Sequence, residues 1–534
     1  MLATPRDGRT REIGNTHVSD TGERFPQWVD LMATTFVTTV NTGAGTIFTP
    51  ASGDTIFVSE TGLIGSTNSN AIGATAISNF NLFVDGTVFG NYSGVSMADL
   101  TGRFGVTVGT EGRLSGNDFG IRAITDDAVS ATVFNEGAIT SNNDAIVIYG
   151  FDVIEITNTG VIGISAAASD GFKNAAFLGA SITRVVNHGT IQAQSDYIST
   201  TDAAITGFTN GADDEIFTVL NTGNISGPIA MVTQNKIDHV TNSGLIEGLV
   251  NIGSTSRSVF NEDSHDDLFE NSGTVIGDVR LGGGDDQFLG DTGLIIGEIR
   301  AGSGDDIIWS GVGNDLLNGG TGRDKLYGGA GNDTATYEYS SAAVRVSLTS
   351  NRGRGGEAQG DWLFDIENLI GSDYNDTLIG DAVSNILEGG NGADTLNGEG
   401  GNDFLFGEFG DDTLIAGDGD DILNGGRGRD ILWSGDGADI FEFLDIEESG
   451  TGSDRDVIKD FEQGVDLIDL SAIGATSFSD SGFTNTAGEV TFKLLSGGTK
   501  TVVEFDPDGD GVANFQILMT NGGFTMTADD FILG

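Results

Sequence analysis

The chain of 534 residues has no cysteine, only 5 prolines and only 4 histidines. Without cysteine it has neither disulfides nor thiolate metal sites, so cysteine usage does not indicate the redox compartment. No run approaches the roughly eighteen apolar residues of a transmembrane segment. The first twenty residues contain arginines but no apolar stretch, which argues against a cleaved N-terminal secretory signal.

Positive charge is also scarce, with 24 Lys and Arg against 79 Asp and Glu and a formal net charge of −55. This balance excludes nucleic acid or an anionic membrane as the main partner, because both carry dense negative charge. A zinc protease of the H-E-x-x-H type needs two histidines at that spacing. His17, His188, His239 and His265 include no such pair. The sequence therefore excludes that enzyme, and we assign these histidines no role.

Glycine is abundant, with 84 residues, and the scarcity of helical patterns points to an all-β chain with glycine turns and short strands. One nine-residue pattern runs eight times over 371–442, with clear copies at GGNGADTLN (389–397) and GGRGRDILW (425–433). Its sixth position is Asp or Asn, and its eighth is Leu or Phe. This G-G-x-G-x-D-x-U-x repeat indicates a Ca²⁺-binding parallel β-roll.

The residue types of the repeat suit Ca²⁺, which takes about 6–8 oxygen ligands. Glycines allow sharp turns that point carbonyls inward, and the aspartate adds a charged oxygen. Two repeats make one turn, so aspartates eighteen residues apart should share an ion; the pairs are Asp394/Asp412, Asp403/Asp421, Asp412/Asp430 and Asp421/Asp439. Residues 371–442 hold 13 Asp and 4 Glu against 2 Arg, so cation binding and folding should be coupled. A flexible Gly/Asp linker is the alternative, but the strict phase argues against it.

The first two repeats of this block depart from the pattern, because Tyr374 and Val383 replace glycine and Asn385 replaces aspartate. We expect these rungs to close the stack. A shorter series with the same spacing lies between 301 and 336. The predicted ligands of several Ca²⁺ ions are Gly302, Gly304, Asp306, Gly311, Gly313, Asp315, Gly320, Gly322, Asp324, Gly329, Gly331, Asp333, Asp376, Gly390, Gly392, Asp394, Gly401, Asp403, Gly410, Asp412, Gly417, Gly419, Asp421, Gly426, Gly428, Asp430, Gly435, Gly437 and Asp439.

A looser repeat, x-G-x-I/V-x-G, precedes the roll, as in NTGVIG (158–163) and NSGLIEG (242–248). Repeats of about 20–50 residues are typical of solenoids. Asparagine recurs two residues before the glycine, at Asn135, Asn158, Asn187, Asn221, Asn242 and Asn271. Stacked asparagines can form amide ladders. A right-handed parallel β-helix is therefore predicted; a β-sandwich or several small β-domains would not need asparagine in register.

The predicted fold is all-β, with an N-terminal right-handed parallel β-helix, a Ca²⁺-binding parallel β-roll and a small C-terminal β region. The predicted boundaries are 1–30 for a polar leader, 31–300 for the β-helix, 301–336 for a first roll block, 337–370 for a hairpin-like insertion that splits the roll, 371–442 for a second block and 443–534 for the C-terminal region. Near the end, Asp506, Asp508 and Asp510 alternate with other residues in DPDGDGVANF (506–515). This segment is either a further Ca²⁺ loop or an acidic hairpin turn.

At this point the C-terminal half resembles known families. Residues 281–442 resemble RTX (haemolysin-type) Ca²⁺-binding repeats. Residues from about 330 to 533 resemble the C-terminal domain of serralysin-type (peptidase M10) secreted metalloproteases, without their protease domain. Besides the nonapeptides, the resemblance rests on FDIENLIGSDYNDTLIGD (364–381), VIKDFEQGVDLIDLS (457–471) and the terminal Asp530-Phe531-Ile532-Leu533.

The resemblance implies an uncleaved C-terminal export signal, a bacterial type I secretion machinery as partner, and an extracellular location. Gly534 follows the usual apolar end of that signal, which is a departure from the family. The acidic repeats should stay open in a cytosol poor in Ca²⁺ and fold outside at roughly 10⁻⁴–10⁻³ M Ca²⁺.

Two functions are open for the β-helix. One is a structural or adhesive rod that binds an extracellular polysaccharide or a cell surface. The other is a polysaccharide lyase or uronate epimerase, which needs a clustered acid/base pair. Cations are sparse in 31–280, and YGFD (149–152) lacks the Pro-His that follows in alginate epimerases. Asp144, Asp152 and Lys173 are the nominal groove residues, and we favour the non-enzymatic interpretation.

Overall fold

The computed structural model describes residues 34–37, 40–43, 45–164, 174–193, 203–208, 216–234, 237–254, 264–495 and 497–534. The chain divides into two compact units, Met1–Glu298 and Ile299–Gly534. The predicted leader (1–30), His17 and Lys173 lie outside the described residues. Within the ranges given above, no helix has the length and apolarity that crossing a membrane requires.

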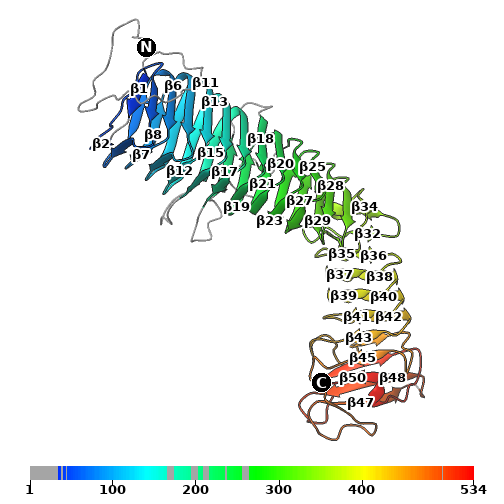
Figure 1. Ribbon diagram of the computed structural model, residues 1–534. Coiled ribbons are helices and arrows are strands. Elements are labelled where there is room, and N and C mark those ends of the chain that lie inside the picture. Colours follow the sequence, from blue (N-terminus) through cyan, green and yellow to red (C-terminus); the bar gives the residue numbers. More distant parts are fainter. Residues whose placement is uncertain are drawn as a thin grey trace, which may run out of the picture. The chain divides into compact units, whose positions relative to one another are not determined.

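The first unit is a parallel β-helix whose strands form three columns (Figure 1). The first column stacks β1 (Thr34–Val37), β3 (Thr55–Val58), β6 (Ser78–Val84), β9 (Thr101–Val108), the ends of β11 (Phe119–Asn135), β13 (Asp144–Asn158) and β15 (Asn174–Asn187), then β18 (Ile216–Asn221), β20 (Ile237–Asn242), β22 (Leu268–Asn271) and β25 (Gln287–Leu289). The second column stacks β2 (Val40–Gly43), β4 (Leu63–Ser66), β7 (Thr87–Gly90), β10 (Arg113–Gly116), β12 (Ala138–Ser141), β14 (Val161–Ile164), β16 (Thr190–Gln192), the starts of β19 (Asn224–Gln234) and β21 (Leu245–Ser254), β23 (Thr274–Ile276) and β26 (Leu294–Ile296). The third column stacks β5 (Ile72–Thr75), β8 (Ser93–Ala98), the starts of β11, β13 and β15, β17 (Ala203–Phe208), the ends of β19 and β21, and β24 (Val279–Gly283). The predicted β-helix is thus confirmed.

The predicted asparagine ladder is present at one corner of this helix. Each Nδ2 donates to Oδ1 of the asparagine on the next coil, at 2.7 Å from Asn135 to Asn158 and 2.8 Å from Asn158 to Asn187. The same bond, at 2.8 Å, joins the remaining neighbours Asn187, Asn221, Asn242 and Asn271. All six side chains are buried. An unmade bond at a buried amide costs about 1–3 kcal/mol, so the ladder holds the coils in one register.

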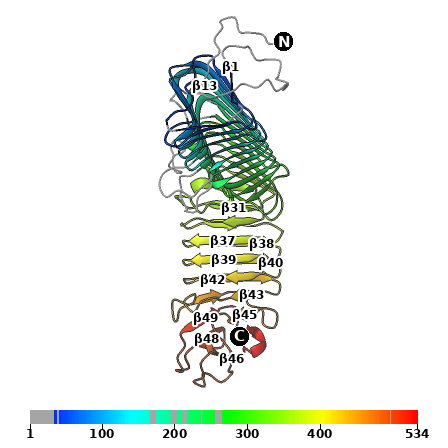
Figure 2. The same ribbon diagram turned by 60° about the vertical axis from the view of Figure 1, so that its left-hand side comes forward.

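The second unit contains the β-roll, whose rungs from β37 to β43 follow one another in Figure 2. One column stacks β29 (Leu316–Thr321), β31 (Thr334–Thr336), β35 (Asn368–Ile370), β37 (Ile386–Asn391), β39 (Phe404–Phe409), β41 (Ile422–Asn424), β43 (Ile440–Glu442), β45 (Leu467–Asp469) and β50 (Phe531–Ile532). The facing column stacks β32 (Arg345–Ser347), β36 (Thr377–Ile379), β38 (Thr395–Gly400), β40 (Thr413–Asp418), β42 (Ile431–Asp436), β44 (Asp456–Ile458) and β49 (Phe515–Met519). The apolar eighth residues of the repeat, such as Leu396, Leu405 and Leu414, point inward and are fully buried.

The predicted insertion contains an antiparallel hairpin of β32 and β33 (Arg352–Arg354), followed by the short helix η1 (Gly356–Ala358) and β34 (Trp362–Phe364). On one side β34 pairs with β30 (Lys325–Ala330), which itself pairs with β28 (Ile307–Val312). On the other side β35 pairs with both β31 and β37. The strand stack therefore passes through the insertion and does not stop there.

The C-terminal region closes the roll with antiparallel strands. β47 (Glu489–Leu495) pairs with β48 (Lys500–Asp506), and β48 pairs with β49. The short helix η2 (Ala528–Asp530) leads into β50, where Phe531 is buried against β45. β46 (Ser477–Phe478) pairs with the start of β47.

Candidate metal centre

The sixth-position aspartates of the roll are buried and form two ladders. In each ladder the backbone N–H of one aspartate donates to Oδ1 of the aspartate eighteen residues later. The bonds measure 2.7 Å for Asp394 to Asp412, 2.8 Å for Asp403 to Asp421, 2.8 Å for Asp412 to Asp430 and 2.9 Å for Asp421 to Asp439. These are the four pairs that the spacing predicts, so the structure brings those residues together.

The second carboxylate oxygen, Oδ2, accepts no hydrogen bond at six successive ladder positions within the described part of the chain. They are Asp394, Asp403, Asp412, Asp421, Asp430 and Asp439. Each of these side chains is at most 2 % exposed. A buried, ionised oxygen without a donor costs several kcal/mol, so it requires either a proton or a cation.

Glycine at the first position of most repeats of the long block leaves room for these oxygens, whereas two repeats have Ala416 and Ser434 there. A Cβ on Gly389 would lie 2.6 Å from Oδ2 of Asp394 and 2.9 Å from the carbonyl oxygen of Gly407. One turn further, a Cβ on Gly407 would lie 2.5 Å from Oδ2 of Asp412 and 2.4 Å from the carbonyl oxygen of Gly425. A carboxylate and a carbonyl of the next coil therefore converge where the side chain is missing. This oxygen-only cluster fits Ca²⁺.

Glycine at the fourth position is required for the coils to approach. Gly410 has φ +143°, and a Cβ there would lie 1.3 Å from the carbonyl oxygen of Gly392. Gly419, with φ +147°, would place its Cβ 1.5 Å from the carbonyl oxygen of Gly401. No side chain can replace these glycines without separating neighbouring turns.

The ladder aspartates have raised pKa values in the metal-free protein. Burial raises the pKa of Asp394, Asp403 and Asp412 to about 7, although the backbone N–H that each accepts acts in the opposite direction. Burial and the neighbouring Asp456 raise the pKa of Asp430 further, to about 9. A bound divalent cation would reverse these shifts by placing opposite charge beside each carboxylate.

The first two rungs of the long block differ from the later ones, as the sequence predicts. Both oxygens of Asp376 are engaged: Oδ1 accepts the Val344 N–H at 2.7 Å, and Oδ2 accepts the Ser372 N–H and hydroxyl at 2.5 and 2.9 Å. The amide of Asn385 donates to the Glu367 carbonyl at 2.7 Å. Hydrogen bonds within the protein thus occupy the open position at these rungs, which sets Asp376 apart from the other predicted ligands.

The shorter block shows the same bonding, from Asp306 to Asp324 at 2.9 Å and from Asp315 to Asp333 at 2.8 Å. Its next rung comes from residues outside the repeat. The Asp324 N–H donates to Oδ1 of Asp361 at 3.0 Å, while Oδ2 of Asp361 accepts the Tyr337 hydroxyl at 3.2 Å. Burial, reinforced by the charge of Asp324, raises the pKa of Asp361 to about 8.

The C-terminal end of the roll adds two aspartates that the nine-residue spacing misses. The Asp430 N–H donates to Oδ1 of Asp456 at 2.8 Å, and the Asp439 N–H donates to Oδ1 of Asp466 at 3.2 Å. Oδ2 of Asp456 is buried without a hydrogen bond, whereas Oδ2 of Asp466 accepts the Glu462 N–H at 2.7 Å. Both aspartates precede a buried strand in the order Asp-x-apolar, as in the repeat, and this order is the signal that could have identified them.

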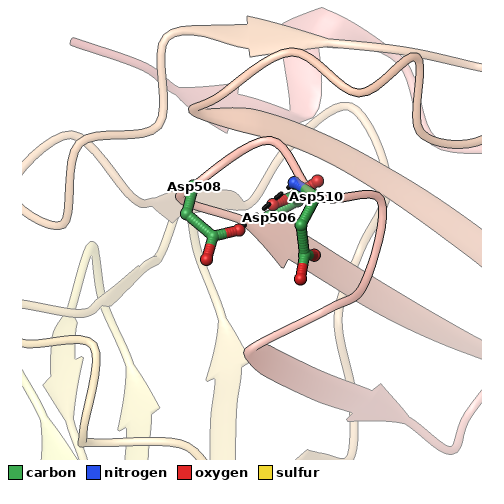
Figure 3. Close-up of side chains that lie close together, drawn as sticks. All are labelled: Asp506, Asp508 and Asp510. Atoms are coloured by element: carbon green, nitrogen blue, oxygen red, sulfur yellow. Dashed lines mark hydrogen bonds between the residues drawn. The ribbon is translucent and has the colours of Figure 1, made fainter.

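The three carboxylates at 506–510 also gather, with one oxygen from each lying within 4.8 Å of the others (Figure 3). Asp506 is buried, and its two oxygens accept the N–H groups of Gly509 and Gly511 at 2.7 and 2.8 Å. Burial acts to raise the pKa of Asp506, but these two bonds together with hydrogen bonds from Asp508 leave the pKa lowered. Asp508 and Asp510 are exposed. The segment therefore has the bonding of a turn held by Asp506.

The nominal groove residues of the β-helix lie in separate environments. Oδ1 of Asp144 accepts the backbone N–H and the side-chain amide of Asn174, at 2.7 and 2.9 Å, and so links β13 to β15. Asp152 is exposed on β13. With Lys173 outside the described residues, the two described nominees, Asp144 and Asp152, do not form an acid/base pair with each other.

Comparison with known families matches two stretches of the chain. Residues 299–335 match the model of the RTX calcium-binding nonapeptide repeat, and residues 363–533 match the model described as Peptidase M10 serralysin C terminal. Neither match is to a protease domain. The predicted resemblance and Ca²⁺ as the expected ion are thus confirmed. RTX proteins with this C-terminal domain are typically secreted, so the matches support a secreted RTX protein of the type I kind.

No curated protein matches the chain. Among solved structures, the chain is similar to two subunits of a mannuronan C5-epimerase from Azotobacter vinelandii. The subunit AlgE6R2 is 26% identical, over 31% of this chain and 91% of that chain, with a TM-score of 0.21. The subunit AlgE6R3 is 29% identical, over 30% of this chain and 80% of that chain, with a TM-score of 0.19.

Proposed function

We propose that this protein is exported unfolded by a type I secretion machinery and folded by extracellular Ca²⁺, and that its β-helix serves as a structural, adhesive or binding rod. The observation that carries the proposal is the series of buried ladder aspartates whose Oδ2 atoms converge with glycine carbonyls. A chain with this much uncompensated acidic charge gains its folding energy from the ions.

The ions would be held by the aspartates and turn glycines that the sequence predicts, with two changes. Asp456 joins them because its buried Oδ2 has no hydrogen-bond donor among the described residues. Asp376 leaves them because Ser372 and Val344 already engage both of its oxygens. Bound Ca²⁺ supplies the positive charge that keeps these buried carboxylates ionised.

The same coupling explains how export and folding are kept apart. Stabilisation by a ligand that binds only the folded state grows as RT ln(1 + [L]/Kd), about 2.7 kcal/mol at a concentration one hundred times Kd. Several sites in series multiply this dependence. The roll would stay open inside the cell and close outside it.

The rod interpretation of the β-helix is supported by its regular interior. Its coils are joined by the asparagine ladder, and the groove residue Asp144 is used for coil-to-coil bonding. The second candidate, a polysaccharide lyase or epimerase, is tested by proton NMR of uronic-acid and neutral polysaccharides incubated with the Ca²⁺-loaded protein. New unsaturated or inverted sugar signals would establish catalysis and overturn the rod.

The Ca²⁺ proposal is tested by circular dichroism of the full chain during titration with Ca²⁺ and then with chelator. We expect cooperative gain of β structure, reversed by chelator. The variant Asp412→Asn should shift the titration to higher Ca²⁺, whereas the exposed Asp436→Asn, with the same charge change, should not. A circular dichroism spectrum that does not change when chelator is added would overturn the proposal.

A further inference from the structure

The hairpin β32–β33 presents three exposed arginines on one face. Arg345 and Arg354 are direct cross-strand partners, and Arg352 lies two residues along on the same face, because Val346 and Gly353 between them point inward. Within the described part of the chain, none of these three guanidinium groups forms an ion pair. Like charges directly opposite each other destabilise an antiparallel pair. The hairpin therefore concentrates positive charge at a cost in stability, in a chain of net charge −55.

Four aromatic rings continue the same surface across the neighbouring strands. Trp309 and Tyr327 stack with ring centroids 4.3 Å apart, and Tyr327 and Phe364 stack at 4.8 Å. Trp362 stacks on Phe364 at 6.0 Å, and the guanidinium of Arg352 lies 3.2 Å from the Trp362 ring centroid. Trp309 is 50 % exposed. These rings lie outside the core, on a surface that faces solvent.

The strand register places Lys325, Trp362 and Arg352 in one row, and Trp309, Tyr327 and Phe364 in the neighbouring row, two residues along each strand. Lys325 pairs with Trp362 across β30 and β34, and Trp362 pairs with Arg352 across β34 and β33. Their inward neighbours Leu326 and Leu363 are buried, so the paired residues all point outward. We call this surface the arginine–aromatic face; it comprises Trp309, Lys325, Tyr327, Arg345, Arg352, Arg354, Trp362 and Phe364.

We propose that the arginine–aromatic face binds an acidic polysaccharide through its carboxylate groups. Arginine donates two parallel N–H bonds to a carboxylate, and three arginines on one face can hold successive sugar units. Tyr327 stacks between Trp309 and Phe364, so both of its faces are covered. Ring edges carry partial positive charge and so favour anions as well.

Other polyanions fit this surface less well. Single-stranded nucleic acids need free aromatic faces on which bases can stack, and here Tyr327 stacks with a ring on either side while Arg352 lies over the Trp362 ring. A duplex or an anionic bilayer presents dense negative charge over a large area, which a chain of net charge −55 repels around the small positive site. A polysaccharide with separated carboxylates avoids most of that repulsion.

The three arginines of the hairpin lie outside both matched stretches. Arg345, Arg352 and Arg354 lie between residues 299–335 and 363–533, in a stretch that neither family model covers. The Ca²⁺ ladder does not involve them. The inference rests on the proposed function in one respect, because Ca²⁺ must fold the roll that carries this face. Circular dichroism of the wild type and of each variant shows whether the roll has folded, so a loss of folding is distinguished from a loss of binding.

The test measures binding of an oligogalacturonate to the Ca²⁺-loaded full chain by calorimetry and by tryptophan fluorescence. We expect the triple variant R345Q/R352Q/R354Q to bind about tenfold or more weakly. The control R103Q/R113Q/R184Q removes three exposed arginines of the β-helix, with the same change in net charge, and should bind as the unaltered protein does. The charge-preserving R345K/R352K/R354K should fall between them, because lysine cannot form the bidentate bond.

Three results would overturn the inference. They are equal weakening by the hairpin and control variants, equal binding of the methyl-esterified oligomer, and tighter binding of duplex DNA or of phosphatidylcholine–phosphatidylserine vesicles. If the glutamine variant loses its Ca²⁺-induced spectrum, the binding measured for the lysine variant is the test. Binding of the oligogalacturonate at full strength by the lysine variant would show that bidentate arginine–carboxylate bonds are not used, and would overturn the inference.

Discussion

Replacing one ladder aspartate by asparagine should change stability in opposite directions with and without Ca²⁺. In Asp412→Asn the side-chain oxygen that accepts the Asp394 N–H is kept, while the negative charge at Oδ2 is removed. Without Ca²⁺ the wild-type carboxylate destabilises the folded state, because its charge is buried. With Ca²⁺ the same charge is a ligand.

The size of the metal-free effect follows from the raised pKa. Burial takes the pKa of Asp412 from 3.8 to about 7. Below pH 3.8 the carboxyl is neutral in both states and costs nothing; as pH rises through about 7 the folded state loses stability relative to the unfolded chain. At about 1.4 kcal/mol per pH unit the loss approaches about 4 kcal/mol at pH 8. Asparagine has no charge to bury and avoids this loss.

With Ca²⁺ bound the sign reverses. The ion must contribute more than the roughly 4 kcal/mol that the buried charge costs. A site at one thousand times its Kd contributes about 4.1 kcal/mol, so the wild type exceeds the variant in stability above that excess of Ca²⁺. The assay is urea unfolding at pH 8, followed by circular dichroism, in chelator and in excess Ca²⁺; if the chelated chain starts unfolded, refolding by a stabilising osmolyte replaces the first arm.

The exposed Asp436→Asn is the matched control and should change stability by less than about 0.5 kcal/mol in both conditions. A shift of the same sign for Asp412→Asn in chelator and in Ca²⁺ would refute the reasoning, since it would mean that Oδ2 does not face a cation.

Three further predictions concern pH and the two ladders. In chelator the roll should be most stable at acid pH and should lose stability as pH rises through about 6 to 7, the pKa values of Asp421 and Asp394. The Ca²⁺ concentration at the titration midpoint should rise on acidification, because protons compete with Ca²⁺ for the carboxylates. Titrations at pH 5.5 and 7.5 check both. Asn187→Ala should destabilise the β-helix by about 2–5 kcal/mol by leaving buried amides unpaired on both sides, while Asn142→Ala, in the exposed pair with Asn117, should cost under about 1 kcal/mol; urea unfolding compares them. Gly410→Ala should abolish Ca²⁺-induced folding of the roll, whereas Gly452→Ala, with φ +72° and open space around it, should cost only about 1–2 kcal/mol for its backbone conformation.

Features that repeat without interruption could be predicted from the sequence in detail. The asparagine ladder and the four aspartate pairs follow from period and residue type alone, because every turn repeats the same local chemistry. The eighth-position leucines follow in the same way, since each coil needs one apolar residue facing inward.

Features that depend on irregular segments could not be predicted. Asp361 and Asp456 occupy ladder positions, but 37 and 26 residues separate them from their partners, Asp324 and Asp430, instead of eighteen. A loop of arbitrary length can return the chain to the same rung, so spacing carries no information there. The hydroxyl of Tyr337 at Asp361 is likewise a tertiary contact, invisible in any local pattern.

The asparagine ladder also makes the length of the β-helix adjustable in whole steps. Each ladder asparagine is followed, two residues later, by a glycine whose missing Cβ lets the next coil sit directly on it; a Cβ on Gly223 would lie 2.1 Å from the carbonyl oxygen of Gly189. Removing residues 188–221 would join Asn187 to Thr222 and Gly223 and would stack Asn187 on Asn242. The Asn-x-Gly sequence and the asparagine ladder would then be kept in a β-helix that is one coil shorter. Each such coil changes the stack by about 4.8 Å, the spacing of neighbouring strands. The length of the β-helix can therefore be increased or decreased by duplicating or deleting whole coils, while the residues of its interior stay the same.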